Sequence, residues 1–339
     1  MTSFPWAPGS ATGIGSLPGT DPDEAARMVF GELPDLPHLP ELPDRGPGSD
    51  MLGRTAALLV DIAVDLQPSG WRVVDRPGHD MRRAVGYLAH DLDVLEEVAD
   101  GYTGPLKLQV TGPWTLAAAL ELHYGDKVVS DLGAVRDLRQ SLAEGLRRHV
   151  AEVRRRVPGA DIVAQLDEPG LPPVMTGRVP TASGFGTLRS VDAPLVEAGL
   201  AEVLAAAQAT PVVHCCARRP PLDLFRAAGA RALSYDAGLV TEADDEALGA
   251  AVDAGLSLWP GVVPATDARM SDLAGTVRPV QKLWQRLGFD PAELAARVVV
   301  TPACGLAGAS PAHARAALTR CRDAARALRE EPDWTGGPR

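Results

Sequence analysis

The feature that most constrains the fold of this chain is a regular alternation of short apolar runs with longer helical patterns. Eight apolar runs occur along the 339 residues, at 13–16, 71–74, 106–112, 161–166, 211–214, 232–236, 256–263 and 297–304. Helical patterns predict helices at 50–67, 80–99, 130–156, 192–208, 220–228, 242–254, 270–287 and 310–330. Strands that alternate with helices in this way are typical of βα units and a parallel sheet.

Eight such units, with no linker-like break in composition, predict an α/β chain folded as one closed (β/α)8 TIM barrel over residues 1–339, a single domain. A doubly wound open sheet is the competing architecture. Against it, GIGSLPG at 13–19 lacks the third glycine of a dinucleotide-binding fingerprint and has Pro18 where the helix should begin. Residues 33–48 repeat proline every three positions, which favours an extended, solvated loop over helix or strand pairing.

The charge of the chain favours a small-molecule substrate. Lys and Arg number 33 against 44 Asp and Glu, and the basic residues are scattered among acidic ones, so no surface for nucleic acid or anionic lipid is predicted. No apolar run approaches the length of a membrane span, and the first basic residue is Arg27, unlike the start of a signal peptide. We therefore expect a cytoplasmic protein that binds neither nucleic acid nor membrane, with its four cysteines reduced or bound to metal.

Polar and thiol side chains follow the apolar runs, at the edge where barrels carry their active sites. His214 and Cys216 are two residues apart at a strand end, so both side chains fall on one side of the chain. Cys304 ends a strand three units later and is expected to face the same barrel mouth. One imidazole and two thiolates are ligands that zinc prefers, so these residues predict a Zn²⁺ site. From spacing alone, the fourth position belongs to Asp236, to the substrate, or to both in exchange.

This ligand set favours activation of a thiol over activation of water. Two thiolates and a histidine leave the zinc ion without net charge, which is a poor setting for forming hydroxide but suits the binding of a third thiolate. A thiol, whose free pKa is about 8.5, ionises on such a metal and keeps enough nucleophilicity to attack carbon. The expected reaction is alkyl transfer to sulfur.

Several segments, taken in order, resemble the catalytic carboxy-terminal barrel of the cobalamin-independent methionine synthases. They are GIGSLPGTD at 13–21, VTGPWTLA at 110–117, QLDEPGL at 165–171, VVHCC at 212–216, WPGVV at 259–263 and TPACGL at 301–306. The resemblance extends from about residue 12 to about residue 325. It implies a zinc-dependent methyltransferase that moves a methyl group to the thiol of L-homocysteine and so forms methionine.

The resemblance also implies roles for individual residues. The family has a metal-binding glutamate at the strand-end position of Asp236, which makes Asp236 the expected fourth ligand. In the family, a serine-containing loop and carboxylates hold homocysteine, and one of these carboxylates precedes an Asp-Met pair by five residues, as Asp75 precedes Asp80 here. The homocysteine-binding positions expected from the resemblance are Ile14, Gly15, Ser16, Asp75 and Asp167.

The chain departs from the family on the side of the methyl donor. Long members carry an additional amino-terminal barrel, which these 339 residues do not contain, and a histidine after the WPGVV-like turn that is thought to protonate the departing folate. This sequence has Thr266 near that position, and Asp267 is the candidate replacement acid. The donor is then methyltetrahydrofolate, if an acid is present, or a methyl-corrinoid supplied by a corrinoid protein, whose leaving group needs no proton.

Two other functions fit the same residues. One is zinc-dependent alkyl transfer to a different thiol, as in the related corrinoid and coenzyme M transferases. The other is a barrel that holds zinc or a thiol without catalysis. The pair His214 and Cys216 argues against the metal-free uroporphyrinogen decarboxylase relatives.

Overall fold

The central element of the molecule is a six-stranded parallel sheet. The computed structural model describes residues 4–332. The strands are β3 (Gly104–Thr111), β4 (Ala160–Asp167), β5 (Thr210–Cys215), β6 (Ala232–Asp236), β7 (Ser257–Val263) and β8 (Thr301–Pro302). They lie side by side in the order of the sequence, each parallel to the next, as successive βα units require.

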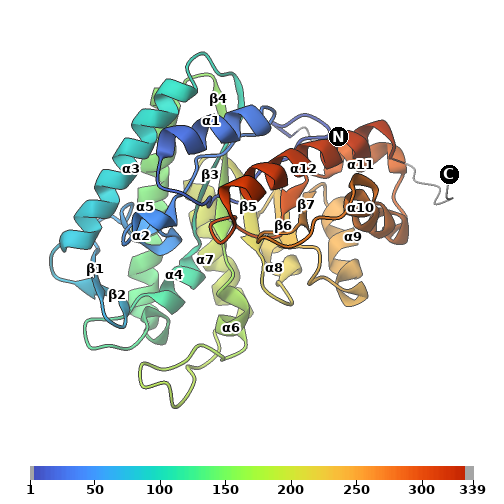
Figure 1. The fold of residues 1–339 in the computed structure, drawn as a ribbon. Coiled ribbons are helices and arrows are strands. Elements are labelled where there is room, and N and C mark those ends of the chain that lie inside the picture. The colour runs from blue at the N-terminus through green and yellow to red at the C-terminus, as the bar shows by residue number, and fades with distance from the viewer. Residues whose placement is uncertain (1–3, 333–339) are drawn as a thin grey trace.

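Helices surround these strands, from α3 and α5 on one side to α9 and α10 on the other (Figure 1). The helices are α1 (Pro22–Glu32), α2 (Met51–Ala56), α3 (His79–Val98), α4 (Pro113–Ala119), α5 (Leu132–Arg156), α6 (Leu171–Met175), α7 (Ala193–Ala206), α8 (Leu222–Ala227), α9 (Asp245–Asp253), α10 (Leu273–Leu287), α11 (Leu294–Arg297) and α12 (Pro311–Glu330). Short 3₁₀ turns lie at η1 (Pro43–Arg45), η2 (Val128–Ser130), η3 (Glu242–Asp244) and η4 (Pro291–Glu293). The predicted alternation of strands and helices is therefore confirmed from β3 onward.

The apolar run at 71–74 is not part of this sheet. It forms β2 (Gly70–Val74), which pairs antiparallel with β1 (Ala63–Gln67) in a separate two-stranded sheet. The helix expected over 50–67 is accordingly limited to α2, because the second half of that pattern is extended. Gly70, the first residue of β2 after the turn, has a φ of 132°, a conformation that favours glycine, and this allows the chain to reverse there.

The proline-rich segment 33–48 is extended, as expected, only in its middle, at 37–42, between a turn and η1, and this middle is buried rather than solvated. Leucine repeats in the segment with the same period of three as proline, and the buried leucines are Leu33, Leu36, Leu39 and Leu42. Proline every third residue leaves the residues between free to pair, and single parallel bridges form at His38 with Lys107 and at Glu41 with Ser16. These leucines make the segment part of the core. The sequence did not show this because leucine and proline repeat with the same period of three.

The run at 13–16, expected as the first strand, also pairs through single bridges. Ala11 bridges to Val300 beside β8, and Ser16 bridges to Glu41. Segments 11–16 and 38–41 thus lie between the two edge strands of the sheet, β8 and β3, without forming strands of their own.

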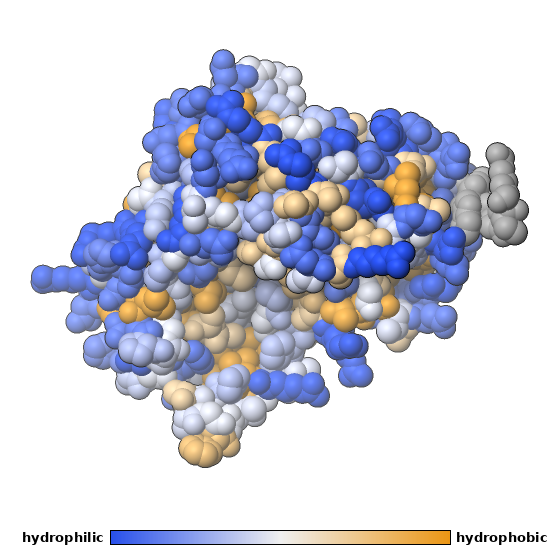
Figure 2. Space-filling view, in the orientation of Figure 1, coloured by the Kyte–Doolittle hydropathy of each residue, from blue (hydrophilic) through white to orange (hydrophobic). Residues whose placement is uncertain are grey.

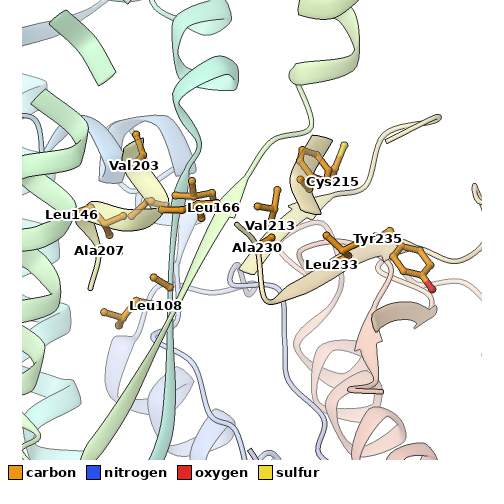
Figure 3. Close-up of a cluster of buried hydrophobic side chains, with 14 of the residues drawn as sticks. Leu108, Leu146, Leu166, Val203, Ala207, Val213, Cys215, Ala230, Leu233 and Tyr235 are labelled. Carbon is orange, nitrogen blue, oxygen red and sulfur yellow. The ribbon is translucent and has the colours of Figure 1, made fainter. Parts of the chain in front are cut away.

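One face of the sheet packs against helices. Because side chains alternate along a strand, Leu166, Val213, Cys215, Leu233 and Tyr235 share this face. Figure 3 shows them with Leu146 of α5 and Val203 of α7 in one buried cluster. Cys215 therefore lies in the apolar core, away from the other face of β5.

The opposite face of the strands becomes more polar toward their carboxyl ends. A buried apolar cluster lies first, made of Trp6, Leu36, Val163, Val212, Ala232, Trp259 and Val299. Two residues further along their strands come Gln165, His214, Ser234 and Thr301, all buried and polar. Two residues further again come Asp167, Cys216 and Asp236. The enclosed face is thus an apolar base, a polar layer and then a set of reactive groups.

None of the helices among residues 4–332 is long and apolar enough to cross a membrane. The face of the molecule drawn in Figure 2 is mainly hydrophilic, and its apolar residues lie in several separate groups.

A first prediction tests whether the proline-rich segment belongs to the core. Leu36→Ala should lower the free energy of unfolding by about 2 to 5 kcal/mol, because it leaves a cavity in the apolar base. Denaturant unfolding would measure this, with Asp35→Ala as the control, since Asp35 is exposed. Equal effects of the two substitutions would show that the segment is not part of the core.

Candidate metal and substrate site

A cavity of about 250 Å³ opens at the carboxyl ends of the strands, above the polar layer. It gathers seven of the residues predicted from the sequence, namely Ile14, Gly15, Ser16, Asp167, His214, Cys216 and Cys304. Six residues that were not predicted as site residues also line it, and among these Glu41, Asp50 and Met51 come from the segment before β1. Three of the four expected metal ligands and most of the expected substrate contacts therefore share one small space.

Three of the four expected metal ligands form a cluster. Ligand atoms of His214, Cys216 and Cys304 all lie within 4.8 Å of one another, and the two Sγ atoms are 3.2 Å apart. Atoms bound tetrahedrally to one zinc ion lie roughly 3.3 to 3.8 Å apart, given metal–ligand bonds of about 2.0 to 2.3 Å. The cluster thus needs only small adjustments to close around an ion.

The histidine ring is held in the orientation that a metal requires. Nδ1 of His214 lies 2.8 Å from Oγ of Ser234, its neighbour across the β5–β6 register. Nε2 is buried and has no hydrogen-bond partner within residues 4–332. A proton on Nδ1, donated to Ser234, leaves the lone pair of Nε2 free. A buried, unpartnered ring nitrogen beside two thiols fits a metal ion.

The two thiols differ in acidity. The hydrogen bond from Cys216, together with His214, lowers the pKa of the Cys304 thiol to about 4, whereas the same contact with Cys304 and burial raise the pKa of Cys216. Cys304 is therefore the more acidic of the two thiols, and the thiolate is the form that binds a metal cation.

Asp236 lies at the end of β6, beside this cluster but not within it. Its Oδ1 accepts a hydrogen bond of 2.8 Å from the amide of Gly238, and burial followed by the nearby Cys304 raises its pKa. Its carboxylate is not among the ligand atoms that lie within 4.8 Å of one another. The structure thus gathers three of the four expected ligands and leaves the fourth nearby.

Two carboxylates form part of the cavity wall. Asp167 accepts a hydrogen bond of 2.7 Å from Nε2 of Gln165, and Glu41 accepts one of 3.0 Å from Nε2 of Gln109. Both carboxylates are buried, which raises the pKa of Asp167 to about 7 and also raises that of Glu41. Glu41 was missed in the sequence because it lies in the proline-rich segment, and the leucine period of that segment was the available signal.

The structure does not bring Asp75 to the cavity. Asp75 follows β2 and is exposed, because the hairpin carries it toward solvent. The sequence contains two Asp-Met pairs, and it is Asp50-Met51, not Asp80-Met81, that lines the cavity. The five-residue spacing does not identify Glu41 from this pair either, because the residue five positions before Asp50 is Arg45.

Asp267 also lies outside the cavity lining. Its carboxylate is half-exposed and accepts hydrogen bonds from Oγ and the amide of Ser310, at 2.6 and 2.8 Å, beside the amino end of α12. These bonds lower the pKa of Asp267. A carboxyl group that is ionised and already hydrogen-bonded is a weak proton donor at neutral pH.

Comparison with known proteins gives two informative matches. A family model described as the catalytic domain of the cobalamin-independent synthases matches residues 9–327. Among solved structures, a B12-independent methionine synthase from Shewanella sp. W3-18-1, in complex with selenomethionine, superposes with a TM-score of 0.60 at 12% identity, over 96% of this chain and 99% of that one. At 12% identity, the likeness to this solved structure shows the fold alone.

Two further results carry no argument. A Burkholderia cenocepacia J2315 protein of the proposed lyase/mutase class has a TM-score of only 0.37 at 16% identity, over 96% of this chain and 85% of that one. A search of curated proteins found no significant match.

A second prediction concerns the serine that supports the histidine. Ser234→Ala should weaken the binding of added Zn²⁺ by roughly 10- to 100-fold, because the ring of His214 loses the group that fixes its orientation. Competition with a chelator of known affinity would measure this. Ser257→Ala is the matched control, since Ser257 is also a buried serine on a neighbouring strand but bonds to Arg297 and Trp259. The same affinity in both variants would exclude a role for Ser234.

Proposed function

Because the chain belongs to the cobalamin-independent synthase family, whose catalytic-domain model matches residues 9–327, we propose that it is a zinc-dependent methyltransferase that acts on the thiol of L-homocysteine. One observation carries this proposal. The His214, Cys216 and Cys304 cluster faces the same small cavity as the loop 14–16 and two buried carboxylates. A thiol-activating metal and groups suited to an amino acid thus lie within reach of one substrate.

The proposed architecture is a single (β/α)8 barrel domain. The single bridges that join segments 11–16 and 38–41 to each other, and to β8 and β3, support this. On this view the two segments occupy the first and second strand positions of the barrel. They also supply Ser16 and Glu41 to the cavity.

The metal-binding roles follow from the ligand cluster. His214, Cys216 and Cys304 would hold zinc, and Asp236, beside them at the end of β6, is the candidate fourth ligand. Zinc bound there lowers the pKa of a coordinated thiol, so that the thiolate persists at neutral pH. Ser234 would keep Nε2 of His214 directed at the ion.

The cavity wall supports an amino acid as the thiol substrate. Glu41 and Asp167 are buried carboxylates on the wall, and a buried ammonium group needs such partners. We propose that these two, rather than Asp75, bind the ammonium group of homocysteine. The loop Ile14–Ser16 lies in the same wall.

The methyl donor in this proposal is methyltetrahydrofolate or a methyl-corrinoid, the latter carried by a corrinoid protein. A methyl group on a folate nitrogen leaves poorly unless that nitrogen is protonated. The lowered pKa of Asp267 makes this residue a poor source of that proton and favours the corrinoid.

A third prediction tests the proposed reaction. Zinc-loaded protein should form methionine from L-homocysteine when given methyltetrahydrofolate, as mono- or polyglutamate, or methylcobalamin. Cys304→Ser should reduce the rate by more than the roughly 10- to 100-fold that is typical of losing a group that supports a ligand. Cys321→Ser, a change of a buried cysteine in α12, should leave the rate unchanged.

Other outcomes of the assay point to the alternatives. Methyl transfer to 2-mercaptoethanesulfonate but not to homocysteine would indicate a different thiol acceptor. Stoichiometric zinc without transfer to either thiol would indicate a binding protein, and protein that takes up no zinc would contradict the proposal altogether.

A fourth prediction uses the acidity of Asp167. Burial raises the pKa of this carboxyl to about 7, so it gains a proton and loses its charge as the pH falls through 7. Methionine, which has the ammonium group but no thiol, should therefore bind the metal-free protein more weakly at pH 6 than at pH 8. Calorimetric titration would measure this. Asp167→Asn should bind weakly at both pH values, whereas Asp75→Asn should keep the wild-type profile.

A further inference from the structure

The main-chain carbonyl of Ile14 is held by two buried side chains. It accepts hydrogen bonds of 2.7 Å from Nζ of Lys107 on β3 and of 3.0 Å from Nε2 of Gln165 on β4. Both side chains are fully buried in the interior. Burying the ammonium group of a lysine costs free energy unless the group is paired and hydrogen-bonded. Lys107 therefore provides an interaction that an apolar residue could not, namely the hydrogen bond to the Ile14 carbonyl.

The other side of the same peptide bond has a free donor. The peptide between Ile14 and Gly15 is trans, so the N–H of Gly15 points opposite to the carbonyl that Lys107 and Gln165 hold. Gly15 is buried and lines the cavity, yet its N–H donates no hydrogen bond within residues 4–332. A buried main-chain N–H without a partner is rare and costs free energy, which points to a ligand that accepts from it.

Lys107 also connects this peptide to the carboxylates of the wall. Its Nζ lies 3.2 Å from Oε1 of Gln109, whose Nε2 donates to Glu41. Gln165, the second donor to Ile14, donates with the same nitrogen to Asp167. One buried lysine and two glutamines thus fix the peptide and both carboxylates relative to one another.

We propose that Lys107 and Gln165 are positioning residues that hold the Ile14–Gly15 peptide so that its N–H binds the α-carboxylate of an amino-acid substrate. Lys107 does not line the cavity and acts through the peptide. The substrate's ammonium group is bound at Glu41 and Asp167, so the cavity selects ligands that carry both charges. This inference rests on the proposed function only in taking an amino-acid thiol as the ligand.

The test compares two thiols that differ in one group. L-Homocysteine and 3-aminopropane-1-thiol share the thiol and the ammonium group, but only the first has a carboxylate. Calorimetry on the zinc-loaded protein would give the preference for homocysteine as a ratio of the two dissociation constants. In Lys107→Met that preference should fall roughly tenfold or more, as expected when a hydrogen bond to a charged group is lost.

Several variants make the comparison specific. Lys107→Arg keeps a donor and should retain part of the preference, and Gln165→Leu should lower it in the same way as Lys107→Met. Lys127→Met is the matched control, because Lys127 also donates to a main-chain carbonyl, that of Ala119, outside the cavity lining. If Lys107→Met does not fold, Gln165→Leu and Lys107→Arg provide the result.

Equal weakening of both thiols in Lys107→Met and Gln165→Leu would overturn the inference, since a merely structural role affects both ligands alike. A wild-type protein that does not prefer the carboxylate-bearing thiol would overturn it as well. Failure of the proposed reaction looks different. There, no methionine would form, while the preference and its loss in the variants would still be measured.

Discussion

The parallel register of β4, β5 and β6 determines where the reactive side chains lie. Asp167 pairs with His214 across the first boundary, and His214 pairs with Ser234 across the second. Because side chains alternate along each strand, a shift by one residue would turn His214 toward the helices and bring Cys215 to the cavity. His214, the serine that supports its ring and the adjacent carboxylate all depend on this one set of main-chain hydrogen bonds.

A polar interior of this kind needs compensation, and the structure supplies it through paired charges. Glu41 lies 4.0 Å from Nε of Arg54, which also contacts Asp91. Asp91 receives two further hydrogen bonds from Arg45, at 2.6 and 2.8 Å. All four charged side chains are largely buried, so each depends on its neighbours and the loss of one would leave the others unpaired. The cavity carboxylate Glu41 is thereby tied to helix α3.

The sequence was informative where structure depends on local pattern. Strands β3 to β7 could be predicted because each is a compact apolar run whose burial needs only its neighbours. His214, Cys216 and Cys304 were found because strand ends converge in such sheets. The hairpin at 63–74 and the buried state of the segment at 33–48 could not be predicted, because the burial of Leu36 or Val73 depends on residues far along the chain. Glu41 could not be predicted for the same reason, since no local spacing shows that a residue of the proline-rich segment faces the cavity.

The bridge between Ala11 and Val300 joins residues that are 289 positions apart in the sequence. On a chain made from its amino terminus, segment 11–16 must wait for nearly the whole protein before this partner exists. Contacts of such sequence separation form late in folding, because a long loop must be closed first. The loop 14–16 is bound on one side to this late contact and on the other to Lys107 of β3. Because Cys304 and Gly305 also line the cavity, a chain that has been made only as far as β7 has no complete cavity.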